Sequence, residues 1–198
     1  MIVGADATSD ATILATSATL YGAYRLRRVY YSAFSPIPDA ARALPLRAPP
    51  LVREHRLYQA DWLMRFYGFG HEEIAPGPSD LLSLEIDPKL AWALAHRERF
   101  PVDVNRAPKE MLLRVPGLGV KAVARMLQAR RGRRLRSADL VRLRVPLAKV
   151  LPFVELADHR PGKVLDSEVL RRRLSVAATP RQAALFDDPS DAPTLSAR

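Results

Sequence analysis

The chain has 198 residues, 48% of them hydrophobic, no cysteine, and a formal net charge of +10. Without thiols there can be no disulfide scaffold, zinc ribbon, cysteine nucleophile or cysteine-held iron–sulfur cluster. No apolar run reaches the roughly 18–20 residues that span a membrane, and Asp6 and Asp10 interrupt the place of a signal peptide, so we expect a cytoplasmic protein with no membrane partner.

The positive charge is concentrated in one segment. Residues 97–144 contain fourteen Lys and Arg against four Asp and Glu, and the remainder of the chain is neutral. A basic excess confined to a quarter of the chain indicates a surface that binds a polyanion. The alternative is that these arginines are simply solvated, because Arg outnumbers Lys throughout the sequence.

The first 36 residues predict a small α/β unit. An apolar run at residues 1–5 predicts a strand, Ser9 or Asp10 caps a helix to about Tyr24, and residues 28–34 predict a second strand. Two strands around one helix form a βαβ fragment, and a parallel pair of strands is not stable as a domain by itself.

Residues 37–100 predict a proline-rich connector followed by helices. Five prolines between residues 36 and 50 exclude a continuous helix there. Apolar residues at helical spacing predict a helix over 54–67, with Trp62 and Phe66 widening its apolar stripe and Gly68 ending it. Asp87 before Pro88 predicts the start of a helix through residue 99. The histidines are scattered, so we predict no metal site.

The most specific motif lies at residues 115–121, between an expected helix at 108–114 and another at 120–131. This helix, glycine turn and helix resemble the helix-hairpin-helix family of DNA-binding elements, as does the Asn-x-Ala run-in that begins at Asn105. Gly117 and Gly119 can adopt positive φ and turn their N–H groups outward at the start of a helix, where an anion is favoured. Leu118 should point inward, while Lys121 reaches a neighbouring phosphate. The alternative is a simple tight turn between two helices.

A second, degenerate copy of the motif follows at residues 137–150, with Ser137 as its expected cap. It lacks the glycines, so its turn must be built differently. Between the copies, residues 130–136 form an arginine-rich loop. The sequence thus predicts a mainly α protein with a small α/β N-terminal remnant and a tandem helix-hairpin-helix module at residues 101–160. The predicted DNA contacts are Pro116, Gly117, Leu118, Gly119, Val120, Lys121, Arg125, Arg130, Arg131, Arg133, Arg134 and Lys149.

Three stretches, "MIVGADATSD", "RRVYYSAFSPIP" and "HRLYQADWLMRFYGF", followed by the hairpin, are similar to the carboxyl-terminal half of DNA modification/repair radical SAM proteins. The resemblance implies that residues 1–36 are the end of a partial TIM-like barrel. It also implies a [4Fe–4S] cluster and S-adenosylmethionine in the full-length family, whose genes accompany an uracil-DNA-glycosylase-like gene. Because thiolates hold that cluster and this chain has none, we expect a truncated protein, or one whose other half is encoded separately, with no cofactor or catalytic residue of its own.

Residues 161–198 predict a short helix from about residue 166 and then a disordered polar tail. Within the tail, Gln182, Leu185 and Phe186 resemble the peptide that docks on bacterial sliding clamps. The alternative is that Leu185 and Phe186 tuck onto the body of the protein.

Three functional hypotheses follow. The first is sequence-tolerant binding of duplex DNA in DNA repair, with the sliding clamp and an uracil-DNA-glycosylase-like protein as further partners. The second is one half of a split radical SAM enzyme that requires a cysteine-bearing partner chain. The third is an RNA-binding module that uses the same basic face.

Overall fold

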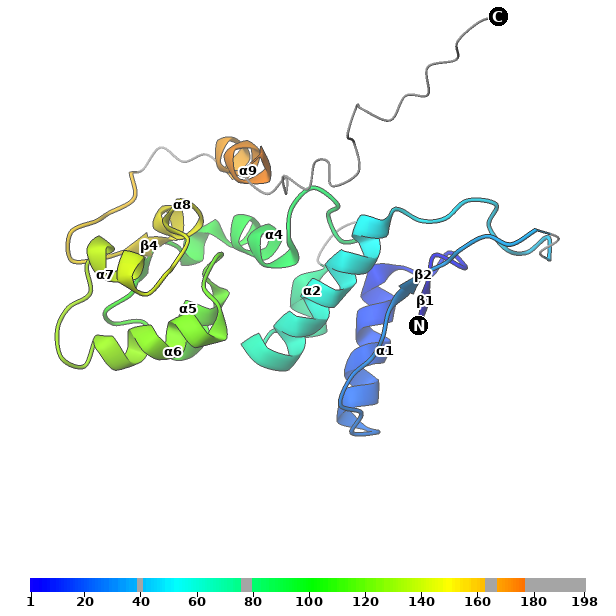
Figure 1. Ribbon diagram of the computed structural model, residues 1–198, viewed down its shortest axis with the longest axis horizontal. Coiled ribbons are helices and arrows are strands. Elements are labelled where there is room, and N and C mark those ends of the chain that lie inside the picture. The colour runs from blue at the N-terminus through cyan, green and yellow to red at the C-terminus, as the bar shows by residue number, and fades with distance from the viewer. Residues whose placement is uncertain (39–40, 76–79, 163–166, 177–198) are drawn as a thin grey trace, which may run out of the picture.

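The computed structural model describes residues 1–38, 41–75, 80–162 and 167–176. Within these ranges the protein is mainly helical, with two short pairs of parallel strands, which confirms the expected mainly α class. Figure 1 shows α1 and α2 side by side at one end of the molecule and α5 to α8 at the other, with α4 between them. One continuous cluster of buried side chains connects the two ends. None of the described helices is both long and apolar enough to cross a bilayer.

The N-terminal unit is a βαβ fragment, as predicted. Strands β1 (Ile2–Val3) and β2 (Ser32–Ala33) pair in parallel around α1 (Asp10–Gly22). The Ser9 hydroxyl caps α1 by accepting a hydrogen bond from the Thr12 N–H at 3.2 Å. Strand β2 is shorter than expected because its outer edge bonds to side chains rather than to another strand.

Those side chains come from the two neighbouring helices. The N–H groups of Val29, Tyr31 and Ala33 donate to Tyr21, Tyr58 and Glu54, respectively. Side-chain acceptors therefore complete an edge that would otherwise leave backbone donors unpaired.

Helix α2 (Leu51–Tyr67) begins directly after Pro50, three residues earlier than predicted. Proline is tolerated at the start of a helix, because the N–H group that it lacks would have no partner within the helix there. It ends at Gly68, whose φ of +72° confirms the predicted glycine stop. Trp62 and Phe66 differ from the prediction: both are 54% exposed and do not belong to the buried stripe.

The middle of the chain contains α3 (His71–Ile74), α4 (Pro88–Ala95) and a 3-10 helix, η1 (Arg97–Arg99). Asp87 caps α4 as predicted, accepting from the Leu90 N–H at 2.9 Å. The α-helix stops at Ala95, earlier than expected, and continues as η1. Trp92 on α4 is buried at the centre of an aromatic cluster with Phe69 and Phe100.

The C-terminal half is built from short elements, which run in chain order as β3 (Val102–Asp103), α5 (Lys109–Arg114), α6 (Val120–Ala129), α7 (Ser137–Arg142), α8 (Leu147–Val150), the 3-10 helix η2 (Leu151–Phe153), β4 (Val154–Glu155) and α9 (Ser167–Val176). Strands β3 and β4 pair in parallel, so the segment that enters this half lies beside the segment that leaves it. The sequence did not predict this pair, because a two-residue strand has no detectable periodicity.

Two side chains fix the segment that joins β3 to α5, which we call the run-in to α5. The Asn105 amide accepts from the Leu135 N–H at 2.6 Å and donates to the Leu135 carbonyl at 3.3 Å. One guanidinium nitrogen of Arg130 donates to the carbonyls of Val104 and Ala107 at 2.9 and 2.7 Å. Arg130 therefore has a structural role, in addition to any contact with a ligand.

We predict that Arg130→Ala lowers the free energy of unfolding by about 1–3 kcal/mol, because two backbone carbonyls lose a charged donor. Arg131→Ala is the matched control, since the Arg131 side chain is exposed, and it should change stability by less than about 0.5 kcal/mol. Urea denaturation measures both values. Equal stability of the two variants would contradict the structural role of Arg130.

Candidate nucleic-acid interface

Helices α5 and α6 pack closely across the glycine turn. Leu112, Val123 and Met126 on their facing sides are fully buried. Leu118, at the tip of the turn, is 1% exposed and points inward, as predicted. The apolar residue between the two glycines thus locks the turn onto the core and leaves its backbone at the surface.

The two glycines have different roles. Gly117 has φ of +83°, and a Cβ atom there would lie 2.9 Å from Val150 and 3.1 Å from the Lys149 Cβ on α8. Gly119 has φ of −94°, an extended conformation open to any residue, so the prediction of positive φ at both positions is wrong for Gly119. A Cβ at Gly119 would meet only the Tyr67 hydroxyl, at 3.7 Å, so the missing side chain leaves the start of α6 uncovered.

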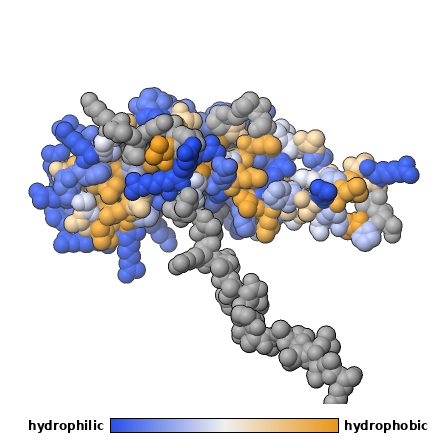
Figure 2. Space-filling model, turned by 90° about the horizontal axis from the view of Figure 1, so that it is seen from above, coloured by the Kyte–Doolittle hydropathy of each residue, from blue (hydrophilic) through white to orange (hydrophobic). Residues whose placement is uncertain are grey.

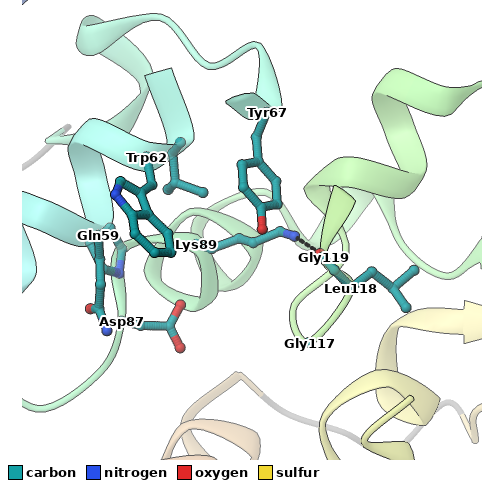
Figure 3. A pocket seen from close by; sticks show the side chains of 10 residues that line it. Gln59, Trp62, Tyr67, Asp87, Lys89, Gly117, Leu118 and Gly119 are labelled. Atoms are coloured by element: carbon teal, nitrogen blue, oxygen red, sulfur yellow. Dashed lines mark hydrogen bonds between the residues drawn. The ribbon is translucent and has the colours of Figure 1, made fainter. Parts of the chain in front are cut away.

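Lys89 anchors the glycine turn through a hydrogen bond to its backbone. This side chain, only 8% exposed, reaches from the first turn of α4 and donates a 2.6 Å hydrogen bond to the Leu118 carbonyl (Figure 3). Its ammonium nitrogen lies 4.6 Å from the centre of the Tyr67 ring. In a trans peptide the C=O and N–H point in opposite directions. The Gly119 N–H therefore points away from Lys89.

Burial lowers the pKa of Lys89 to about 7, and the neighbouring Asp87 carboxylate opposes this shift. The hydrogen bond to Leu118 requires only an N–H donor, so it can persist when the amine is neutral. Sequence reasoning missed Lys89. The available signal was a cation in the first turn of a helix, where the helix dipole disfavours positive charge.

Two N–H groups of the glycine turn have no hydrogen-bond acceptor in the described part of the chain. Leu118 donates its N–H to the Val115 carbonyl at 3.2 Å, whereas the N–H groups of Gly117 and Gly119 have no acceptor among the described residues. The first turn of α6 adds the N–H groups of Val120 and Lys121, which a helix cannot satisfy internally. Converging donors at a helix start form a site for an anion.

The predicted basic contacts divide into two groups. Lys121, Arg125, Arg131 and Arg134 are exposed and have no ion-pair partner within the described part of the chain. Arg133 is paired with Asp139 at 2.5 Å, and Arg130 holds the run-in. Hydrophilic side chains crowd this end of the molecule in Figure 2.

The remaining predicted DNA contacts differ in their exposure to solvent. Pro116 and Leu118 are buried and can contribute only through the backbone, whereas Gly117 and Val120 are exposed. Lys149 is half-exposed on α8, and its Cβ lies against the Gly117 backbone.

The second helical pair, α7 and α8, turns without glycine. Arg144 adopts φ of +57° before Val145 and Pro146, whereas in the first copy the positive φ follows the proline. The predicted cap at Ser137 is wrong. Asp139 caps α7 by accepting from the Arg136 N–H at 3.0 Å, and the Ser137 hydroxyl instead donates to Asp158 at 2.5 Å.

Gln182, Leu185 and Phe186, the predicted clamp-binding residues, lie outside the described residues. The helix before them, α9, begins at Ser167, within one residue of its expected start. Buried Leu170 and Leu174 hold α9 on the body of the protein, and Leu174 lines one pocket together with Pro116 and Gly117 of the turn.

Comparisons with protein-family models, with curated proteins and with solved structures find no match to this chain. The resemblance to radical SAM proteins implied an iron–sulfur cluster, and the residues present do not fit one, because the chain has no thiolate ligand. Within the described ranges, no group of three His, Asp or Glu residues could hold a metal ion.

We predict that Lys89→Met changes how stability depends on pH. The unfolded chain binds the Lys89 proton up to about pH 10.4, whereas the folded chain releases it near pH 7. Between these values unfolding takes up a proton, so the lysine contribution to stability increases with pH, by at most about 1.4 kcal/mol per unit. Urea denaturation between pH 6.5 and 9.5 should show the wild type gaining stability relative to Lys89→Met. Parallel curves would contradict the buried state of the amine.

Proposed function

We propose that this protein binds double-stranded DNA with little sequence preference, in a DNA repair or modification context, through a helix-hairpin-helix element formed by α5, the glycine turn and α6. The observation that carries the proposal is the Gly119 N–H, which has no acceptor among the described residues. It points away from the anchored Leu118 carbonyl at the open start of α6, beside exposed Lys121. A phosphate oxygen is the DNA group that these donors match.

The preference for the backbone follows from the donors themselves. Backbone N–H groups and flexible cations bind phosphates, which are the same at every base pair, and so they position a protein without selecting a sequence. Lys121 and Arg125 extend the site along α6, and Arg131 and Arg134 extend it into the loop that follows. Affinity then depends on the release of counterions from the DNA.

The second helical pair supports a footprint across both strands of the duplex. Gly117 lies against α8, so the two turns are neighbours and Lys149 is close to the phosphate site. Because the second turn is built around Arg144 rather than glycine, we propose that it contributes side-chain cations instead of converging N–H groups.

We predict that duplex affinity falls steeply with salt, with a log–log slope of about −4 to −6. Lys121→Ala with Arg125→Ala should reduce the size of this slope by about 2, because two phosphate contacts are lost. Arg42→Ala with Arg47→Ala is the matched control: both arginines are exposed in the segment between β2 and α2, which lies at the end of the molecule opposite α6 (Figure 1), and should leave the slope unchanged. Fluorescence anisotropy at several salt concentrations measures the slope.

A slope near zero would contradict the proposal. Competition with structured RNA at the same salt tests the RNA alternative, and preferential displacement by RNA would overturn the assignment to DNA.

We predict that Gly119→Thr reduces duplex affinity at least tenfold without loss of stability. Threonine is as acceptable as glycine before a helix, and its side chain would cover the N–H groups at the start of α6. Gly22→Thr, at the exposed end of α1, is the matched control. Gly117→Thr should instead destabilise the fold, because of its positive φ and the contact with Val150. Full binding by Gly119→Thr would exclude a phosphate at this turn.

A further inference from the structure

A groove separates α2 from the glycine turn, and its two walls differ in chemistry. One pocket of about 450 Å³ is lined by Trp62, Phe66, Tyr67, Gly119, Val120 and Lys121. A second pocket, of about 320 Å³, shares Trp62, Tyr67 and Gly119 with it and reaches down to Lys89 and Asp87. Figure 3 shows Trp62 and Tyr67 on the α2 side and the turn on the other. Aromatic rings therefore face the surface that carries the proposed phosphate site.

Trp62 and Phe66 are placed on this wall by helical spacing. They lie four residues apart on α2, so their side chains are neighbours on one face of the helix. Each is 54% exposed, whereas Leu63, between them in sequence, is buried in the core. The guanidinium of Arg65 lies 4.8 Å from the centre of the Phe66 ring, and its charge is paired with the buried Asp61 carboxylate at 2.7 Å.

We propose that the groove binds an unpaired nucleobase, stacked against Trp62 and Phe66, whose flanking phosphate occupies the glycine turn. The inference rests on the proposed DNA binding and names the form of DNA preferred: duplex next to a single-stranded segment. The residues that line both the groove and the phosphate site identify the ligand as part of a nucleotide. Gly119 and Lys121 line both the groove and the phosphate site, and a base is joined to its phosphate through a single sugar.

The chemistry of the groove fits a base better than a purely apolar ligand. Stacking on an aromatic ring accepts any base. The Asp87 carboxylate and the Gln59 amide line the smaller pocket. Asp87 Oδ1 accepts from the Leu90 N–H and Gln59 Oε1 accepts from Arg56, so Asp87 Oδ2 and Gln59 Nε2 are the atoms that can bond a base edge. A pocket of this size falls within the usual range of small-ligand sites. A fully paired duplex holds its bases within the stack and would leave the groove empty.

The test compares a labelled duplex with the same duplex carrying a short single-stranded thymidine overhang. We expect the wild type to bind the overhang duplex about 5- to 100-fold more tightly, as expected for stacking of one or two bases. Trp62→Ala with Phe66→Ala should remove this preference and leave the affinity for the fully paired duplex unchanged. Tyr24→Ala, another exposed aromatic residue, is the matched control. Trp62→Phe should retain most of the preference, because a ring remains.

Tryptophan fluorescence gives a second readout. The chain has two tryptophans, and Trp92 is 1% exposed, so quenching by the overhang would report on Trp62. We expect quenching that is lost in Trp62→Phe. Equal affinity of the wild type for both probes, or an equal loss of affinity for both probes in the double variant, would overturn the inference but not the proposal that the wild type binds duplex DNA. Failure to bind either probe would overturn the proposed function itself.

Discussion

The contact between Lys89 and the Leu118 carbonyl connects the two ends of this molecule. Lys89 belongs to α4, which packs on α2, and Leu118 belongs to the turn between α5 and α6. An amine is costly to bury unless its hydrogen bonds are satisfied. Here a carbonyl oxygen and the face of Tyr67 compensate the charge, and the low pKa reflects the remaining cost. Lys89 therefore helps to set the position of the turn relative to α2, together with the buried core that both ends share.

Similar links from polar side chains join segments on top of the buried core, because the strands are too short to join them. Asp10 accepts from Arg53 and from the Leu82 N–H, and Asn105 ties the run-in of α5 to Leu135. The arginine-rich segment contributes to the same framework through Arg130 and Arg114, the latter paired with Glu73 at 3.1 Å. Part of the basic excess is thus structural, and the exposed remainder on α6 and its loop forms the surface available to a polyanion.

The sequence predicted helix ends that depend on interactions between residues close together in the chain. Ser9 and Asp87 cap their helices, and Gly68 ends α2, each through atoms within a few residues. Features that depend on distant partners could not be predicted. The β3–β4 pair joins segments about fifty residues apart, Ser137 loses its role as a cap to Asp139, and Lys89 is buried only because the turn covers it. Periodicity placed Trp62 on the apolar side of α2, but no helix of the described chain covers that side.

The same long-range packing joins the basic turn to the aromatic face of α2. In the proposed function the glycine turn holds a phosphate, and Trp62 is an exposed ring on the facing wall of the groove. Lys89 holds the turn beside Tyr67, and the groove between them then combines backbone donors, a cation and exposed aromatic rings on one surface. A phosphate site alone favours any duplex, whereas a phosphate site next to an aromatic wall favours DNA with a base free to leave the helix. In the proposed function, buried Lys89 is therefore the residue that holds the phosphate site next to the aromatic wall.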